Sequence, residues 1–312
     1  MVTLKNISQK AGVAVSTVSY ALNNDPRIPE ETKNRVMEAA QELGYLGKSG
    51  RKRNQGYLRQ AVLCLNTING DIYTEIANAL KSVLSVSNCE LMIYIGNNIT
   101  KIKWLDGLFV LNSNVETSDI EEIARRRIPV VMMDRDITID GATNVTLDNF
   151  HGCYSATKTL INRGAKSFAF IGGPNRSFES NDRYEGFCKA LSDSMLQRKS
   201  TIILQSDFTY DGGVNVSRYL LESPTLPDAI VCANDETAMG VYAGLKSKGL
   251  EDKVMLAGFD GLAPKTPFRY VTAKAEHKHW GAIAAYSMLQ LFDHAKTAEQ
   301  KIKIPVEVVE FY

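Results

Sequence analysis

A run of hydroxyl-bearing side chains lies near the start of the sequence, in the segment VSTVSYAL at residues 15–22. Apolar Val18 and Leu22 are spaced to share one face of a helix. The remaining surface of that helix is small, polar and uncharged, and it carries Ser16, Thr17, Ser19 and Tyr20. Side chains of this kind can reach the base edges or the phosphates of DNA in the major groove.

Two further short helices must hold this segment. Residues 4–10 predict the first, with Thr3 as its cap, and Gly12 then supplies a turn residue that can adopt a positive φ. A third helix is predicted from Pro29 to Gly44, where Val36, Ala39, Ala40 and Leu43 follow helical spacing. We expect these apolar residues to form a small core with Ile7, Val18 and Leu22. Residues 1–46 therefore predict an all-α helix-turn-helix domain.

The charge distribution is consistent with a head that binds a polyanion. The 312 residues carry a net charge of only +1, yet residues 1–60 contain ten Lys or Arg against five acids. This front end is therefore at +5 and the remainder at −4. A basic head on a mildly acidic body favours nucleic acid as the partner, although a solvated charged surface would show the same balance.

The stretch from Val2 to Tyr45 resembles the head of the LacI/GalR repressor family, notably in TLKNI, AGVAVSTVS and ALN. The resemblance implies double-stranded, near-palindromic operator DNA as the partner. It assigns base reading to Val15, Ser16 and Tyr20, and phosphate contacts to Thr3, Thr17, Ser19, Asn23 and Thr32. Packing against the third helix is the structural alternative for Tyr20.

Residues 47–60, GKSGRKRNQGYLRQ, are expected to form a basic linker. Family members usually have a proline here and a hinge helix whose leucine wedges into the minor groove. Gly47 stands at the proline position and Asn54 at the leucine position, so the wedge is absent. The residues Arg51, Lys52 and Arg53 could still follow phosphates or enter a narrow minor groove, or the segment could be a flexible tether.

From Ala61 onward, apolar strands alternate with amphipathic helices, a pattern typical of parallel sheets covered on both faces. The last strand is predicted over residues 304–311, IPVEVVEF. Between Ile95 and Leu105, the segment GNNITKIKW is too short for a crossover that contains a helix, so one helix should be missing there.

The motifs at residues 173–174 (GP), 183–187 (RYEGF), 233–240 (ANDETAMG) and 258–260 (GFD) resemble those of the family's sensor domain, which shares its fold with periplasmic sugar-binding proteins. The resemblance implies a two-lobed α/β domain over residues 61–312, crossed by the chain about three times. We expect one lobe over about 61–153 plus 281–298, and the other over about 154–280 plus the C-terminal strand.

An effector crevice is expected where the strands of both lobes end. By resemblance, Arg183, Asn234, Asp235 and Asp260 supply polar contacts to a sugar-like effector, while Phe208 and Tyr73 cover its apolar side. Alternatives from the residues themselves are a helix cap for Asn234 and Asp235, a surface ion pair for Arg183 and a core position for Phe208. Gly261, where a second Asp is common, and the missing Gln-Pro pair at Ala275-Glu276 depart from the family pattern.

An enzyme is not indicated, because the sequence has no P-loop, no G-x-S-x-G elbow and no HExxH. The five cysteines are widely spaced without a CxxC pair, which predicts buried reduced thiols and neither a metal site nor a cofactor. Without a signal peptide or an apolar run of about 20 residues, we expect a cytoplasmic protein with no membrane partner.

The sequence therefore predicts a transcription regulator, a repressor that acts as a homodimer or a tetramer and responds to a sugar or sugar derivative. Two alternatives remain open. Control could come from a protein partner or a nucleobase-type ligand. An exported sugar-binding module would have required a signal peptide.

Overall fold

The computed structural model describes residues 3–22, 25, 27–43, 58–68, 70–196, 201–223, 225–264, 268–293 and 300–311. None of the helices formed by these residues combines the length and the apolar character that a membrane crossing requires. The predicted linker falls almost wholly outside the described residues, and so do Asn23, Arg51, Lys52 and Arg53.

The head is a bundle of three helices, α1 (Leu4–Ala11), α2 (Val15–Leu22) and α3 (Glu30–Glu42). Ile7, Val18 and Val36 are inaccessible to solvent, and Ala39, Ala40, Leu22 and Leu43 pack with them. Thr3 is the N-cap of α1, and the turn after α1 contains Gly12 at a φ of 65°. The predicted core, cap and turn are therefore confirmed.

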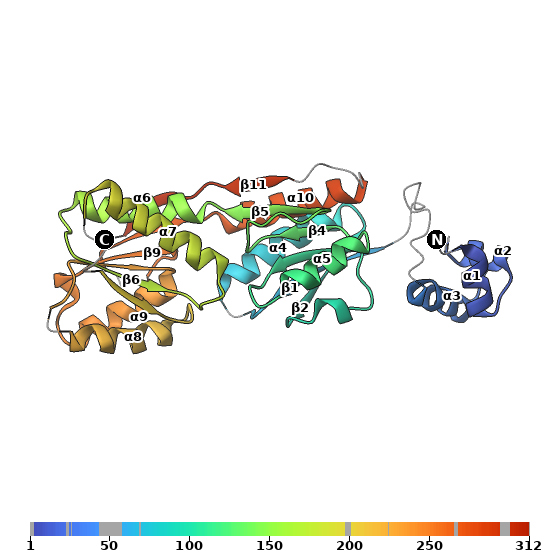
Figure 1. Ribbon diagram of the computed structural model, residues 1–312, viewed down its shortest axis with the longest axis horizontal. Coiled ribbons are helices and arrows are strands. Elements are labelled where there is room, and N and C mark those ends of the chain that lie inside the picture. The colour runs from blue at the N-terminus through green and yellow to red at the C-terminus, as the bar shows by residue number, and fades with distance from the viewer. Residues whose placement is uncertain are drawn as a thin grey trace.

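The body contains two six-stranded sheets, which Figure 1 shows in two lobes. The first sheet is parallel throughout. Its strands, in order across the sheet, are β11 (Lys301–Ile304), β5 (Ala142–Leu147), β4 (Val130–Met132), β3 (Gly107–Leu111), β1 (Arg59–Leu65) and β2 (Cys89–Ile95). Both faces of this sheet are buried, since Leu63 and Leu65 pack into one core and Val62 and Cys64 into another.

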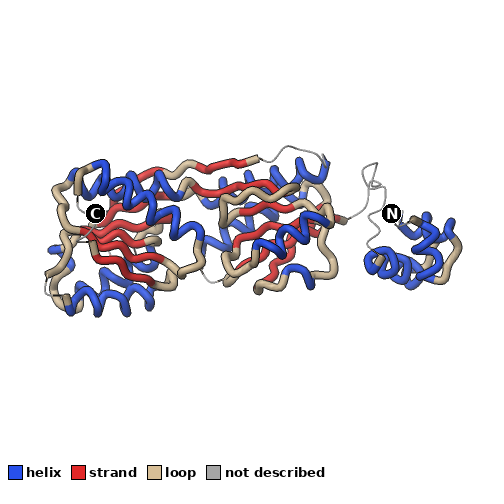
Figure 2. Tube along the Cα trace, in the orientation of Figure 1, coloured by secondary structure: helices blue, strands red, loops and turns tan. Residues whose placement is uncertain are grey.

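Helices cover the two faces of the first sheet (Figure 2). On one face, α4 (Asp71–Ser85) packs beside α10 (His277–Asp293), whose Trp280 donates a hydrogen bond to the Val145 carbonyl at 2.6 Å. On the other face lie α5 (Thr117–Arg125) and the single 3-10 turn η1 (Ile99–Lys101). That turn is all the regular structure between β2 and β3, so the prediction of a missing helix is confirmed.

The second sheet is parallel except for β12, which pairs antiparallel with β10. Its order is β12 (Glu307–Phe311), β10 (Tyr270–Lys274), β9 (Met255–Asp260), β8 (Ala229–Cys232), β6 (Phe168–Gly172) and β7 (Ile202–Gln205). One face packs against α6 (Asn149–Asn162) and α7 (Phe178–Asp193), the other against α8 (Tyr210–Glu222) and α9 (Asp235–Lys246). The 3-10 turn η3 (Glu251–Lys253) leads into β9.

The described chain passes between the sheets three times: after β5, after β10, and between β11 and β12. The three predicted crossings are confirmed. The prediction of one last strand over residues 304–311 was wrong, because the segment divides at Pro305-Val306, with β11 in the first sheet and β12 in the second. A proline cannot donate a ladder hydrogen bond, which favours a break there.

The cysteines have the predicted inert surroundings. All five are free, and four of them, Cys64, Cys89, Cys153 and Cys232, are buried. Burial raises the pKa of the Cys64 and Cys153 thiols to about 12. These thiols therefore stay protonated at neutral pH, and a protonated thiol is a poor nucleophile and a poor metal ligand.

Candidate functional site

The exposed face of α2 carries the three residues predicted to read bases. Val15, Ser16 and Tyr20 are all exposed, and Tyr20 retains 46% of its accessible surface. Val18 and Ala21 point into the core from the opposite face. Because Ser16 and Tyr20 are four residues apart, they lie on the same side of the helix. The head thus presents a hydroxyl, a small apolar group and a phenol ring together.

An arginine holds the ring of Tyr20. The Arg27 guanidinium carbon lies 5.0 Å from the ring centroid. Arg27 also donates two side-chain hydrogen bonds to the Asp25 carboxylate, at 2.9 and 2.7 Å, and these lower the pKa of Asp25 to about 2. The ring therefore stacks on a fixed cation, and in the described structure its stacking partner comes from the turn after α2.

The predicted phosphate-binding residues take different positions. Thr3 is exposed, and its hydroxyl and backbone N–H both donate to Asn6 Oδ1, at 2.7 and 2.9 Å. Thr17, Ser19 and Thr32 are half-buried at the rim of the head core. Small hydroxyls at such positions can donate to a phosphate oxygen while their methyl or methylene groups pack inward.

In the body, the polar residues gather where parallel strands end. Asp260 is the last residue of β9, and Asn234 and Asp235 lie just after β8. Phe208 follows β7. The carboxyl ends of the strands in an open α/β sheet form one edge, which is where such sheets bind ligands. Arg183 joins this edge from α7.

Arg183 is buried and largely committed to the protein. Its Nε donates to Asn149 Oδ1 at 2.9 Å and its Nη1 to the Ala233 carbonyl at 2.5 Å. The guanidinium carbon lies 3.7 Å from the centroid of the Phe259 ring. The third nitrogen, Nη2, faces Asp260 Oδ1 at 3.8 Å, which is too long for a hydrogen bond.

The Asp260 carboxylate lies near the Arg183 guanidinium but accepts no hydrogen bond from the described residues. Only 9% of the residue is exposed, and no donor within the described chain lies at hydrogen-bonding distance from its oxygens. Burial raises its pKa to about 7, although Arg183 opposes the shift. The backbone adopts a φ of 112°, which a residue other than glycine rarely adopts. A strained, buried acceptor without a donor is typical of a ligand site.

Asn234 and Asp235 support the site from behind. Asn234 caps α9 by accepting from the Thr237 N–H at 3.2 Å, and its Nδ2 donates to the Phe208 carbonyl at 2.8 Å. Asp235 is completely buried and accepts from the Leu262 N–H at 2.7 Å and the Thr272 hydroxyl at 2.9 Å. Asn234 thereby fixes the Phe208 backbone, and Asp235 fixes the loop that follows Asp260.

The two predicted aromatic residues come from different lobes. Phe208, at a φ of 68°, lays its ring on Gly173, where an added Cβ would lie only 2.1 Å from the ring. Tyr73 is half-buried on α4, and burial raises its pKa to about 12. The charges of Glu179, Asp260 and Arg183, which belong to the second lobe, also act on the pKa of Tyr73.

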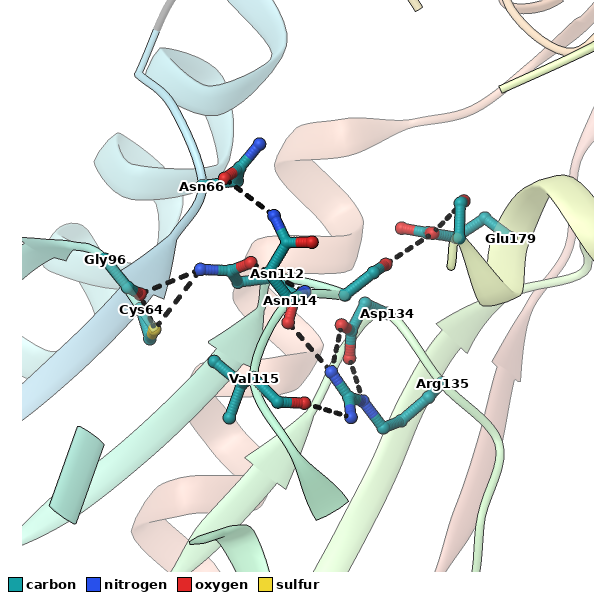
Figure 3. Close-up of polar contacts among 11 residues, drawn as sticks. Cys64, Asn66, Gly96, Asn112, Asn114, Val115, Asp134, Arg135 and Glu179 are labelled. Carbon is teal, nitrogen blue, oxygen red and sulfur yellow. Dashed lines mark hydrogen bonds and ion pairs between the residues drawn. The ribbon is translucent and has the colours of Figure 1, made fainter. Parts of the chain in front are cut away.

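The sequence reasoning missed a polar cluster at the strand ends of the first lobe (Figure 3). Arg135, which is 1% exposed, donates to both Asp134 oxygens at 2.9 and 2.8 Å. It also donates to the carbonyls of Asn112 and Val115, at 2.8 and 2.9 Å. Arg135 therefore fixes the loop after β3. Polar residues that directly follow buried strands, as in NSN and DR, were the available signal.

Three contacts join the lobes at this loop. The Ser113 hydroxyl donates to Glu179 Oε2 at 3.4 Å. Arg176 pairs with Glu116 at 2.7 Å, and Arg135 lies 4.8 Å from the Phe178 ring centroid. The Arg176–Glu116 pair is exposed and should contribute little to stability, whereas Ser113, Phe178 and Glu179 are half-buried.

A cavity of about 290 Å³ adjoins Asp260. Buried His277 lines it too, with its Nδ1 at 4.0 Å from Glu75 Oε2, and burial lowers the His277 pKa to about 4. Within the described chain, His277 Nε2 has no hydrogen-bond partner. The other lining residues are Asp71, Ile72, Glu75, Gly261, Leu262, Ala263, Lys274, Ala275, Glu276 and Lys278. Arg183, Phe208 and Tyr73 lie outside this wall. A search of the described residues finds no group of His, Cys, Asp or Glu able to hold a metal ion.

Comparison with known families identifies both parts. Residues 3–47 match the family of bacterial regulatory proteins of the lacI type. Residues 100–312, well over half of the chain, match the periplasmic binding proteins and sugar binding domain of the LacI family. The chain belongs to the LacI family. It is accordingly a DNA-binding transcription regulator and not an enzyme, as the sequence predicted.

Individual relatives of this LacI-family chain resemble it over most of their length. The probable HTH-type transcriptional repressor ExuR of Bacillus subtilis is 28% identical, with 97% of this chain and 95% of the relative covered. A LacI family regulator from Enterococcus faecium, solved with bound ribose, superposes with a TM-score of 0.73 at 21% identity and covers 81% of this chain and 98% of its own. The lac repressor dimer bound to operator and an anti-inducer gives 0.69 at 19%, covering 99% and 98%.

Proposed function

We propose that this LacI-family chain is a dimeric repressor of a near-palindromic operator, and that a sugar-like polyol bound between its lobes sets its affinity for DNA. The main support for an effector site is the buried Asp260 carboxylate, which faces Arg183 but accepts no hydrogen bond from the described residues. A pair of neighbouring hydroxyls would supply donors to the carboxylate and an acceptor to Arg183 Nη2.

The aromatic groups fit the same ligand. Phe208 is fixed by Asn234 and Gly173 on the second lobe, and Tyr73 on α4 would contact the ligand from the first. Aromatic faces can cover the apolar C–H side of a sugar ring while the carboxylate and the guanidinium bind its hydroxyls. The ribose in the Enterococcus faecium structure supports a sugar-sized ligand for this fold.

Asn234 and Asp235 have positioning roles in this proposal. Both side chains direct their hydrogen bonds to the protein, one to Phe208 and the start of α9, the other to Leu262 and Thr272. Losing either should therefore displace the groups that contact the ligand. Arg183 and Asp260 would make the direct polar contacts.

Pairing of two heads accounts for operator recognition. One helix-turn-helix covers a single half-site, and two copies related by a two-fold axis double the contacts on a palindrome. The dimeric lac repressor on its operator supports this arrangement. Val15, Ser16 and Tyr20 would read bases, while the basic segment that contains Arg51, Lys52 and Arg53 would add attraction to phosphates.

The experiment begins with the full chain and random duplex DNA. Repeated selection should enrich a near-palindromic sequence, and fluorescence anisotropy then gives the operator affinity in the presence of each sugar that raises the melting temperature. We expect one sugar to change that affinity by about 5- to 150-fold. Asp260→Asn should abolish the change, whereas Asp252→Asn, an exposed aspartate in η3, should preserve it. An equal response in both variants would contradict the proposed site.

A further inference from the structure

Two carboxylates, those of Glu179 and Asp260, lie near the buried Arg183 guanidinium. Glu179 lies in the first turn of α7, and Arg183 lies four residues later on the same face of that helix. Asp260 reaches the same space from the end of β9, with Oδ1 at 3.8 Å from Arg183 Nη2. The three groups act on one another electrostatically, since the Glu179 charge raises the pKa of Asp260 and Arg183 lowers it.

Most of the hydrogen-bonding nitrogens of the Arg183 guanidinium already have partners in the protein. Two of its three nitrogens donate to Asn149 and to the Ala233 carbonyl, and only Nη2 turns toward Asp260. Arg135, in the wall of the first lobe, is paired with Asp134 through two hydrogen bonds and adds no net charge. Burial raises the pKa of Asp260 to about 7 and also raises that of Glu179, so Glu179, Asp260 and Arg183 together carry a charge of −1 once the pH is high enough to ionise both acids.

Glu179 keeps one oxygen for a ligand. Its Oε2 accepts from the Ser177 hydroxyl at 2.8 Å and from Ser113 at 3.4 Å. Within the described chain, no hydrogen bond reaches Oε1. Ser113 belongs to the first lobe, so the Glu179 carboxylate lies where the two lobes meet.

We propose that the effector is an uncharged or amino-bearing polyol, and that Glu179 is the residue that rejects phosphorylated and carboxylated sugars. The inference rests on the proposed function and specifies its ligand. An anionic ligand would lose its hydration on entering this site, where it would meet two carboxylates. The Arg183 guanidinium, two of whose nitrogens are already paired, would be its main cationic partner, and burying a charge without a partner costs free energy. An amino group would add a cation where the crevice has a negative excess.

The test uses full-length protein and isothermal titration calorimetry. The probes are glucose, galactose and ribose, each compared with its amino derivative and with its carboxylate or phosphate derivative. We expect the neutral or amino form of one scaffold to bind at least tenfold more tightly than the anionic form. Tighter binding of an anionic form by the wild-type chain would overturn the inference and leave the proposed function standing. Failure of every probe to bind would refute the sugar effector and the inference together.

Glu179→Gln assigns the selectivity to one residue. The amide keeps an acceptor for Ser113 and Ser177 but removes the charge, so the preference for neutral over anionic ligand should shrink by roughly 10- to 100-fold. Glu185→Gln is the matched control, because Glu185 is exposed on the same helix. Unchanged affinity for selected DNA and an unchanged melting curve verify that the variant is folded. An equal preference in wild type and Glu179→Gln would refute the role of Glu179.

Discussion

Replacing Asp260 with Asn should stabilise the fold at alkaline pH. The folded-state pKa is raised to about 7 from an ordinary 3.8, so the native state binds the proton more tightly than the unfolded chain does. The stability that this proton supplies is fully present below about pH 4 and is lost as pH rises through 7. Between pH 5 and pH 8 the ionisation of Asp260 should remove about 2–3 kcal/mol from the free energy of unfolding.

The asparagine side chain of the Asp260→Asn variant cannot ionise, and asparagine tolerates a positive φ better than most residues. Urea unfolding followed by circular dichroism at pH 5 and pH 8 should therefore show a smaller pH-dependent loss for Asp260→Asn than for the wild type. Asp252→Asn, at an exposed site, controls for the loss of one negative charge. If both variants lose as much stability as the wild type, Asp260 does not titrate near 7 and the argument for a costly buried carboxylate fails.

Ionisation of Asp260 should lower the stability of the fold but raise its affinity for the effector. Hydroxyl groups donate to the ionised carboxylate, so a polyol should bind more tightly as pH rises toward 7 and reach a plateau above it. Calorimetric titrations at pH 5.5, 6.5 and 8 measure this dependence. A wild-type affinity that is constant over this range would show that the ligand does not use the Asp260 carboxylate.

Three further predictions concern the rest of the molecule. Tyr20→Ala should weaken binding to selected operator by about 1–3 kcal/mol with little effect on random DNA in anisotropy assays, and equal losses on both would show that the ring does not read bases. Arg135→Met should lower the free energy of unfolding in urea by about 3–5 kcal/mol because it leaves Asp134 buried and unpaired, and a loss under about 1 kcal/mol would refute that pairing. Gly173→Ala places a Cβ 2.1 Å from the Phe208 ring, so calorimetry should show effector binding at least tenfold weaker while operator binding without effector is kept; unchanged effector affinity would place the ligand away from Phe208.

The sequence alone predicts the head in detail. Apolar residues recur at helical spacing within each predicted helix, and Ile7, Val18 and Val36 meet from the three helices in one core, with Gly12 providing the positive φ at the turn. The same holds for the alternating strands and helices of the body, because local periodicity indicates which segments form strands and which form helices. Arg183 and Asp260 were also predicted, through motifs whose spacing in the chain resembles a known family.

Tertiary structure decided the roles that depend on distant neighbours. Asp235 looks like Asp260 in the sequence, yet it is sealed behind the site by Leu262 and Thr272, and burial raises its pKa well above the ordinary value. Glu179 meets Ser113 only because α7 of one lobe begins beside a strand end of the other. The last two strands belong to different sheets because β11 pairs with β5 and β12 pairs with β10. Hydrogen-bond partners and solvent exclusion arise from packing between segments far apart in the chain, and local sequence patterns do not encode them.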